Sequence, residues 1–184
     1  AAMSIRVLFD KLSRNKSYRV GWGVSFLIEE SVLFDTGENG DWLLHNMKAM
    51  DVDIGKIDAV VISHDHWDHT GGLWRLLERK PSILVYACSG FGTAFKQKVR
   101  ALDSKLIEMD AIVEVAPDIY AGPEIIGTYK DSQIAERALA IDGKGGVAII
   151  TGCAHPGVVR MVRQIMEKFP GKETSLVMGG SHLM

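Results

Sequence analysis

The sequence contains little of what marks a disulfide-rich, secreted or membrane protein. Only two of its 184 residues are cysteines, Cys88 and Cys153, which is too few for a disulfide framework in a chain of this length. The longest uninterrupted apolar run is the six residues Ile83–Cys88, whereas a membrane-spanning helix needs about 20. No basic-then-apolar leader precedes Ser4. We therefore expect a cytoplasmic protein that is not embedded in a membrane.

An excess of charge of one sign is also missing. Lysine and arginine number 21 against 23 acidic residues, a formal net charge of −2, so there is little of the broad positive surface that nucleic-acid binding uses. Apolar residues make up 47% and charged residues 24%, which are ordinary proportions for a globular protein. No linker rich in proline, glycine or serine divides the chain. We expect one domain spanning residues 1–184 and no nucleic-acid partner.

Nineteen glycines separate short β-branched runs, a pattern typical of many short strands joined by tight turns. Strands are expected at Ile5–Phe9, Val24–Ile28, Val32–Phe34, Ala59–Ile62, Ile83–Ala87, Ile112–Val115, Ala138–Ile141, Val147–Ile150 and Leu176–Met178. Apolar spacing predicts a helix over Asp41–Met50 with Asp41 as its cap, another from Leu73 through Leu77, and a third over Pro156–Phe169. Because helices are inserted among groups of strands, we expect an α/β (α+β) fold in which helices cover sheets.

A dense group of metal-ligating residues follows the apolar run at 58–63. His64-Asp65-His66-Trp67-Asp68-His69 holds three of the six histidines of the chain and two carboxylates. Imidazole nitrogens and carboxylate oxygens are the ligands that divalent zinc, iron or manganese accept. A dry apolar core could not hold so many polar groups without partners. The sequence therefore predicts a metal-binding loop directly after a buried strand.

His64-x-His66-x-Asp68-His69 after a buried strand resembles the signature of the metallo-β-lactamase superfamily. Gly23–Ile28, Phe34-Asp35-Thr36-Gly37, the segment 150–157 and Met178-Gly-Gly-Ser-His-Leu183 resemble further motifs of it, and the motifs together span about 23–183. The surrounding residues are similar to the branch labelled dihydropterin ribofuranosyl-aminobenzene phosphate synthase-like. The resemblance implies an αββα sandwich and a metal-dependent hydrolase. Such an enzyme uses a metal-activated water on an ester, phosphoester or related small molecule, including pterin- or phosphate-bearing ones.

The resemblance also implies roles for individual residues. His64, His66 and His155 would bind one ion, and Asp68, His69 and His182 would bind a second. The implied cofactor is thus one or two divalent ions, zinc first, with iron and manganese as alternatives. His66 and Asp68 would take part in catalysis, and Asp35 would orient the metal loop. Two alternatives stay open, since His155 could instead cap the following helix and His182 could be free near the end of the sequence.

The sequence departs from the superfamily pattern at its end. Relatives generally continue beyond Gly-Gly-x-His-Leu with another strand, a last metal-binding histidine and a closing helix, whereas this sequence ends at Met184. We expect either a naturally minimal member or a chain lacking its last strand and helix, with weaker occupancy of the second metal position. His45 is expected to be an ordinary surface residue. An open strand edge would favour pairing between copies, so a homo-oligomer is a hypothesis.

The remaining candidates concern the surroundings of the metal. Cys153 lies two residues before His155, and packing, metal binding or support of a ligand, and nucleophilic attack are all open to it. Lys11 and Arg14 belong to a stretch with four positive charges in nine residues, which could bind a substrate phosphate or could be a solvated loop. Trp67 is a candidate pocket wall. Two rival functions also remain, a metal-binding module with little or no turnover and a di-iron redox protein.

Overall fold

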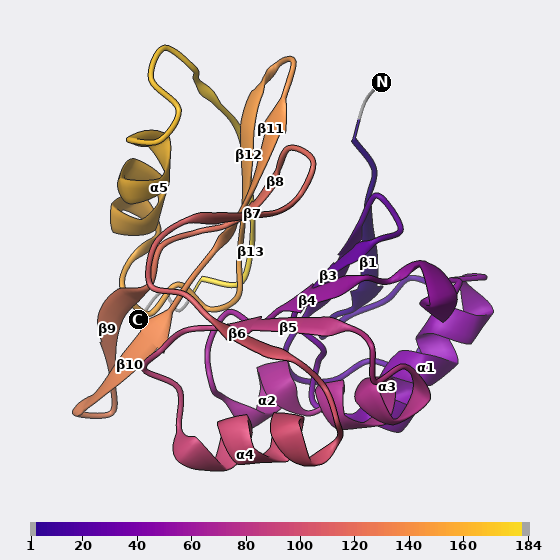
Figure 1. Ribbon diagram of the computed structural model, residues 1–184. Helices are drawn as coiled ribbons and strands as arrows, with labels where there is room; N and C mark the ends of the chain where they lie inside the picture. Colours follow the sequence, from indigo (N-terminus) through magenta and orange to yellow (C-terminus); the bar gives the residue numbers. More distant parts are fainter. Residues whose placement is uncertain (1–2, 182–184) are drawn as a thin grey trace.

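Two β-sheets pack face to face in the computed structural model, which describes residues 3–181, and helices cover both outer faces (Figure 1). The first sheet has the strand order β1-β2-β3-β4-β5-β6. Its strands are β1 Ile5–Phe9, β2 Ser25–Ile28, β3 Val32–Phe34, β4 Ala59–Val61, β5 Leu84–Ala87 and β6 Leu106–Glu108. The strands from β3 to β6 run parallel, and β1 to β3 pair antiparallel.

The second sheet has the strand order β13-β12-β11-β8-β7. Strands β9 and β10 form a separate two-stranded ribbon. These strands are β7 Val113–Ala116, β8 Ile119–Ala121, β9 Ile125–Tyr129, β10 Ser132–Glu136, β11 Leu139–Gly143, β12 Gly146–Thr151 and β13 Thr174–Gly179. A tight hairpin joins β11 to β12, because Gly143 pairs with Gly146 at the turn. All nine predicted strands occur, with ends shifted by at most two residues.

Helices α1 to α4 lie on the first sheet and α5 lies on the second (Figure 1). Their bounds are α1 Gly40–Ala49, the 3₁₀ turn η1 Ile54–Lys56, α2 Trp67–Thr70, α3 Leu73–Arg79, α4 Thr93–Ala101 and α5 Val158–Met166. Two predicted helix starts were wrong. Asn39, not Asp41, caps α1, because its side chain accepts a hydrogen bond from the Trp42 N–H at 3.0 Å. Helix α5 begins at Val158 after Gly157, whose φ of 97° no helix contains, so Pro156 precedes the helix.

Three apolar clusters fill the spaces between the four layers. One lies between α1, α3, α4 and the first sheet, one lies between the two sheets, and one lies between the second sheet and α5. The predicted αββα sandwich is thus confirmed. Among residues 3–181, no helix is both long and apolar enough to cross a membrane.

Arg137 is a charged side chain buried where the two sheets meet. Its guanidinium donates hydrogen bonds to the carbonyls of Gly122, Ala87 and Met109, which belong to both halves of the sandwich. Burial lowers its pKa from the usual range. Arg137→Met should therefore lower the free energy of unfolding by roughly 3 kcal/mol, since buried carbonyls lose a charged donor. Urea denaturation monitored by circular dichroism would measure the loss, and an unchanged midpoint would contradict this role.

Candidate metal centre

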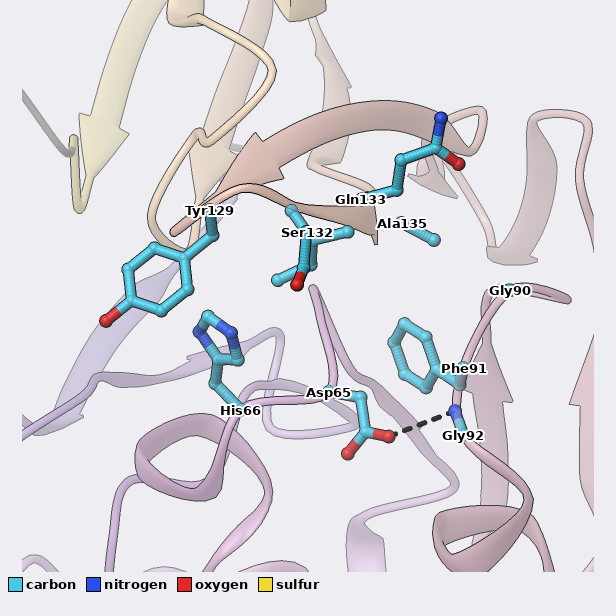
Figure 2. A pocket seen from close by; sticks show the side chains of 10 residues that line it. Asp65, His66, Gly90, Phe91, Gly92, Tyr129, Ser132, Gln133 and Ala135 are labelled. Atoms are coloured by element: carbon cyan, nitrogen blue, oxygen red, sulfur yellow. Dashed lines mark hydrogen bonds between the residues drawn. The ribbon is translucent and has the colours of Figure 1, made fainter.

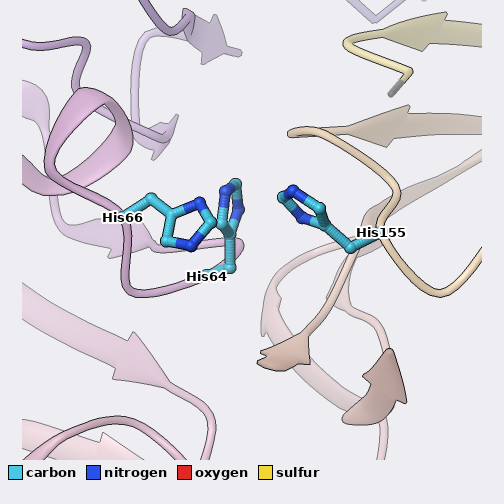
Figure 3. A group of neighbouring side chains, drawn as sticks. All are labelled: His64, His66 and His155. Atoms are coloured by element: carbon cyan, nitrogen blue, oxygen red, sulfur yellow. The ribbon is translucent and has the colours of Figure 1, made fainter. Parts of the chain in front are cut away.

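Three histidines from opposite halves of the sandwich meet at one end of the two sheets. His64 and His66 lie in the loop between β4 and α2, and His155 lies in the loop between β12 and α5. Figure 3 shows the three rings pointing toward one another across a small gap. One possible ligand atom from each lies within 4.8 Å of the others. We call these three residues the histidine cluster.

Asp35 is a fully buried carboxylate that fixes one side of this arrangement. It follows β3 with a φ of 57°, which aspartate tolerates better than most residues, and its backbone N–H bonds to the carbonyl of Val61 in β4. Its carboxylate accepts hydrogen bonds from the Ser63 hydroxyl at 2.6 Å and from His69 Nδ1 at 2.6 Å. Ser63 Oγ also lies 2.7 Å from His64 Nδ1. Since the hydroxyl proton of Ser63 goes to Asp35, the Nδ1 of His64 is the donor to Ser63, and Nε2 is then the nitrogen that can accept a cation.

Glu136 is a second fully buried carboxylate and holds the opposite side. Its oxygens accept the backbone N–H groups of Cys153, Ala154 and His155 at 3.3, 2.6 and 3.1 Å. One of them also accepts from His155 Nδ1 at 2.7 Å and lies 3.8 Å from His64 Nδ1. The loop folds tightly around this carboxylate, with Ala154 at a φ of 56°. Glu136 therefore sets both the backbone and the ring orientation of His155, as Asp35 does for His69.

Burial and neighbouring charges shift the pKa values of three titratable groups in the site, His66, His69 and Asp35. Burial lowers the pKa of His66, and the neighbouring His155 lowers it further, so its ring is neutral at pH 7 and able to bind a cation. Burial also opposes charge on His69, but the charge and hydrogen bond of Asp35 hold the pKa of His69 well above its usual value. Burial raises the pKa of Asp35, and hydrogen bonds from His69 and Ser63 partly offset this. Two buried carboxylates behind convergent imidazoles are a donor set that fits a divalent metal.

Glu136→Gln tests this support of the His155 ring. A glutamine of nearly the same size has only one acceptor oxygen. Its NH₂ group would face N–H groups that now donate hydrogen bonds to the second carboxylate oxygen, so donors would face donors. We expect metal affinity to fall by roughly 10–100-fold, the usual effect of losing a partner of a metal-binding histidine. Isothermal titration with zinc would measure it. An affinity equal to that of the wild type would show that Glu136 does not position His155.

Of the other candidate residues predicted from the sequence, Asp68 and Cys153 lie beside His69, and the rest of those described by the structure are exposed. Asp68 Oδ2 lies 3.6 Å from His69 Nε2, whereas His182 lies outside the described residues. Lys11, Arg14 and Trp67 are exposed, and Lys11 Nζ stands 4.5 Å from the ring centroid of Trp22. His45 is exposed on α1, where its Nε2 bonds to the Ser17 carbonyl at 2.8 Å.

A concave surface opens beside the cluster, under the β9–β10 ribbon. One cavity of about 210 Å³ is lined by His66, Asp65, Phe91, Tyr129 and residues 132–135 (Figure 2). A larger one of about 820 Å³ is lined by His155 and residues 128–133. The Tyr129 ring stands between them, with its centroid 4.8 Å from that of His66 and 5.1 Å from that of His155. Among the described residues, Lys11, Arg14 and Trp67 line neither cavity.

Sequence reasoning missed Glu136 and Tyr129. Glu136 could have been found, because Glu136-Arg137 is a charged pair inside the otherwise apolar stretch 134–141, and such a pair is buried only with partners. Tyr129 carried no such signal. No strand was predicted over residues 125–136, and it is their pairing as β9 and β10 that places Tyr129 over the histidine cluster.

Comparison with known proteins decides the family. The model of the metallo-beta-lactamase superfamily matches residues 19–159, which include five of the six residues predicted to bind metal. The chain belongs to the metallo-β-lactamase superfamily. A curated relative, the 7,8-dihydropterin-6-methyl-4-(beta-D-ribofuranosyl)-aminobenzene-5'-phosphate synthase of Methanocaldococcus jannaschii, is 28% identical over 221 residues, covering 95% of this chain and 75% of the relative. The resemblance to that branch is thus confirmed.

Solved structures of the superfamily agree with this assignment. The crystal structure of Tm1679, described as a metal-dependent hydrolase of the beta-lactamase superfamily, superposes with a TM-score of 0.78 at 27% identity and covers 100% of this chain and 78% of its own. The metallo-beta-lactamase fold protein YhfI from Bacillus subtilis has a TM-score of 0.59 at 17% identity, covering 81% and 61% of the two chains, and so shows the shared fold alone.

Proposed function

We propose that this protein is a metal-dependent hydrolase that uses a metal-activated water to cleave an ester, phosphoester or related small molecule. The observation that carries the proposal is the pair of buried carboxylates, Asp35 and Glu136, which hydrogen-bond to the Nδ1 atoms of His69 and His155 and so fix the orientation of both rings. Such carboxylate–histidine pairs are what metal-binding imidazoles normally have behind them. The similarity to Tm1679, which is described as a metal-dependent hydrolase, supports the same function.

Residue roles follow from this placement. His64, His66 and His155 would hold the ion, for which zinc, iron and manganese are all acceptable to imidazole. A divalent cation there supplies a Lewis acid and lowers the pKa of a water bound to it toward about 7. Asp68, whose side chain is 20% exposed beside His69, would orient the attacking water and accept its proton. Asp35 and Glu136 keep the imidazoles in place through the reaction.

The two cavities suggest the size and chemistry of the substrate. They flank Tyr129, and His66, Phe91 and Tyr129 present aromatic faces to the smaller one. A small molecule with a flat ring would fit against these faces better than a polymer would. The product named for the Methanocaldococcus relative carries both a pterin and a phosphate ester, so we propose a pterin- or phosphate-bearing substrate here. Lys11 and Arg14 remain our prediction for contacts with a phosphate.

A panel of chromogenic substrates tests the reaction class. Protein loaded with zinc, manganese or iron would be assayed with a phosphomonoester, a phosphodiester, a carboxylic ester and a lactone. The proposal expects metal-dependent turnover of at least one class, with loss on chelation. Stoichiometric metal binding without turnover of any of the four would instead favour a metal-binding module. Activity that required iron and an electron donor would favour the redox alternative.

Association of copies is a separate hypothesis. Strand β13 lies at one edge of the second sheet, and Leu176 and Val177 on it are 44% and 42% exposed. Such an edge can pair with another chain. Light scattering that shows a monomer at micromolar concentration would remove the basis for this hypothesis.

A further inference from the structure

The two-residue turn at the tip of the β9–β10 ribbon carries a lysine beside the histidine cluster. Lys130 lines the larger cavity together with His155 and Tyr129. Among the described residues, it is the only lysine or arginine that lines either of the two cavities beside the cluster. The larger cavity therefore has a positive charge of its own, in addition to that of the proposed metal ion.

One aromatic ring connects this lysine to the cluster. The ring centroid of Tyr129 lies 4.8 Å from that of His66 and 5.1 Å from that of His155, and the Nζ atom of Lys130 lies 5.2 Å from the same centroid. Figure 2 shows the Tyr129 ring beside His66 at the end of the ribbon. The ammonium group is thus one ring contact away from two of the proposed metal ligands.

Contacts with the loop after β12 and with α5 hold the ribbon in this position. Gly127 lies so close to the loop that carries His155 that an added Cβ would stand 2.7 Å from the nitrogen of Pro156. The guanidinium of Arg160 on α5 donates a hydrogen bond to the Ile126 carbonyl at 3.0 Å. The ribbon is therefore anchored to the loop and the helix that flank the cluster.

The turn has a backbone that lysine does not favour. Tyr129 pairs with Ser132, so Lys130 and Asp131 are the two turn residues, and their φ values are 46° and 62°. Glycine and asparagine adopt this left-handed backbone more easily, and two-residue hairpin turns of this kind usually contain them. The turn itself thus gives no reason for a lysine, whereas its place in the cavity beside His155 gives one.

We propose that Lys130 binds an anionic group of the substrate, a phosphate or a carboxylate, while the bond to be hydrolysed lies at the histidine cluster. An ammonium group forms charge-assisted hydrogen bonds to such anions, and the part of the substrate between the two ends would lie against Tyr129. The inference rests on the proposed function. It narrows the substrate to a small molecule that carries a negative charge close to the bond that is cleaved.

Other charged residues near the cavity fit this assignment in different ways. Asp131 also lines the larger cavity, so its carboxylate would repel the anion and limit the affinity. Of the described residues, Lys11 and Arg14 line neither cavity and would contact only a part of the substrate that extends beyond it.

Two hydroxamates test the assignment on the zinc-loaded protein without any turnover. Benzohydroxamate carries a metal-chelating group on a neutral ring, and 4-carboxybenzohydroxamate adds a carboxylate at the far end of the same ring. Isothermal titration would give both dissociation constants. We expect the added carboxylate to tighten binding to the wild type roughly fivefold, as a strong solvent-exposed ion pair does, and we expect high salt to remove this gain.

Lys130→Asn removes the charge and keeps the turn, because asparagine adopts the left-handed backbone more easily than lysine does. It should show no preference for the charged hydroxamate, whereas Lys130→Arg should keep the preference. Lys144→Asn is the matched control. Lys144 is an exposed lysine in the β11–β12 turn, away from the ribbon, and its variant loses the same charge and should keep the full gain.

The outcomes separate this inference from the metal centre. Equal affinity of the wild type for both hydroxamates, or a gain that persists in Lys130→Asn, would overturn the role of Lys130 and leave the metal centre intact. A gain lost in Lys11→Ala but not in Lys130→Asn would overturn it in favour of Lys11. If benzohydroxamate itself failed to bind the zinc-treated wild type, the proposed metal centre would be wrong.

Discussion

His66→Ala should lower kcat/KM for a hydrolysed ester by roughly 10³-fold or more. Metal activation of water and of the scissile bond contributes several kcal/mol of transition-state stabilisation, and each 1.36 kcal/mol corresponds to about tenfold in rate. His66 lines the smaller cavity and belongs to the histidine cluster, so removing its imidazole removes both a proposed ligand and a wall of the site. Steady-state kinetics on the best substrate from the panel would measure the loss.

His45→Ala is the control for this substitution. His45 is exposed, and its ring bonds to the Ser17 carbonyl on the outer side of α1. Its loss should change kcat/KM by less than about twofold, as surface substitutions away from a site usually do little. Turnover by His66→Ala at the rate of His45→Ala would contradict the assignment of His66.

Gly152→Ala is expected to disable the site by a steric route. A Cβ at this position would stand 2.2 Å from Ser63 Oγ and 2.8 Å from Asp35 Oδ2, two atoms that the hydrogen-bond chain to His64 and His69 requires. The strand end must move, or the chain of bonds must break. We expect metal affinity to fall by at least roughly 100-fold and the free energy of unfolding to fall by about 1–3 kcal/mol.

Gly145→Ala provides a matched comparison for Gly152→Ala. Among the described residues, a Cβ added at Gly145 in the β11–β12 turn meets no atom within 4 Å. Its metal affinity and urea midpoint should therefore remain those of the wild type. If Gly152→Ala bound metal equally well, the close contact among Gly152, Ser63 and Asp35 would not be needed for the site.

The fold was largely predictable because its strands are short apolar runs bounded by glycine and polar residues. Helix α4 was not foreseen, because only Phe95 and Val99 mark its buried face among polar neighbours. The β9–β10 ribbon was also missed. Its strands carry exposed polar residues such as Thr128 and Gln133 and pair only with each other, so neither shows the apolar run that marks a core strand.

Some residues of the candidate site could also be predicted from the sequence, and others could not. His64, His66 and His69 lie within six residues of one another, and their spacing directly after a buried strand indicates a metal-binding loop. Glu136 and Tyr129 act only through tertiary contacts with residues about 20 to 60 positions away, which no local pattern encodes. The sequence left the role of Cys153 open, and only the fold places its Sγ 3.2 Å from His69 Nε2.

Metal content per chain, measured by plasma mass spectrometry on protein purified without added metal, tests the central claim most directly. The wild type and His45→Ala should each carry at least one equivalent of a divalent transition metal, and His66→Ala should carry far less. If His66→Ala retained as much metal as the wild type, or if the wild type took up none even when zinc was supplied, the histidine cluster would not be a metal centre.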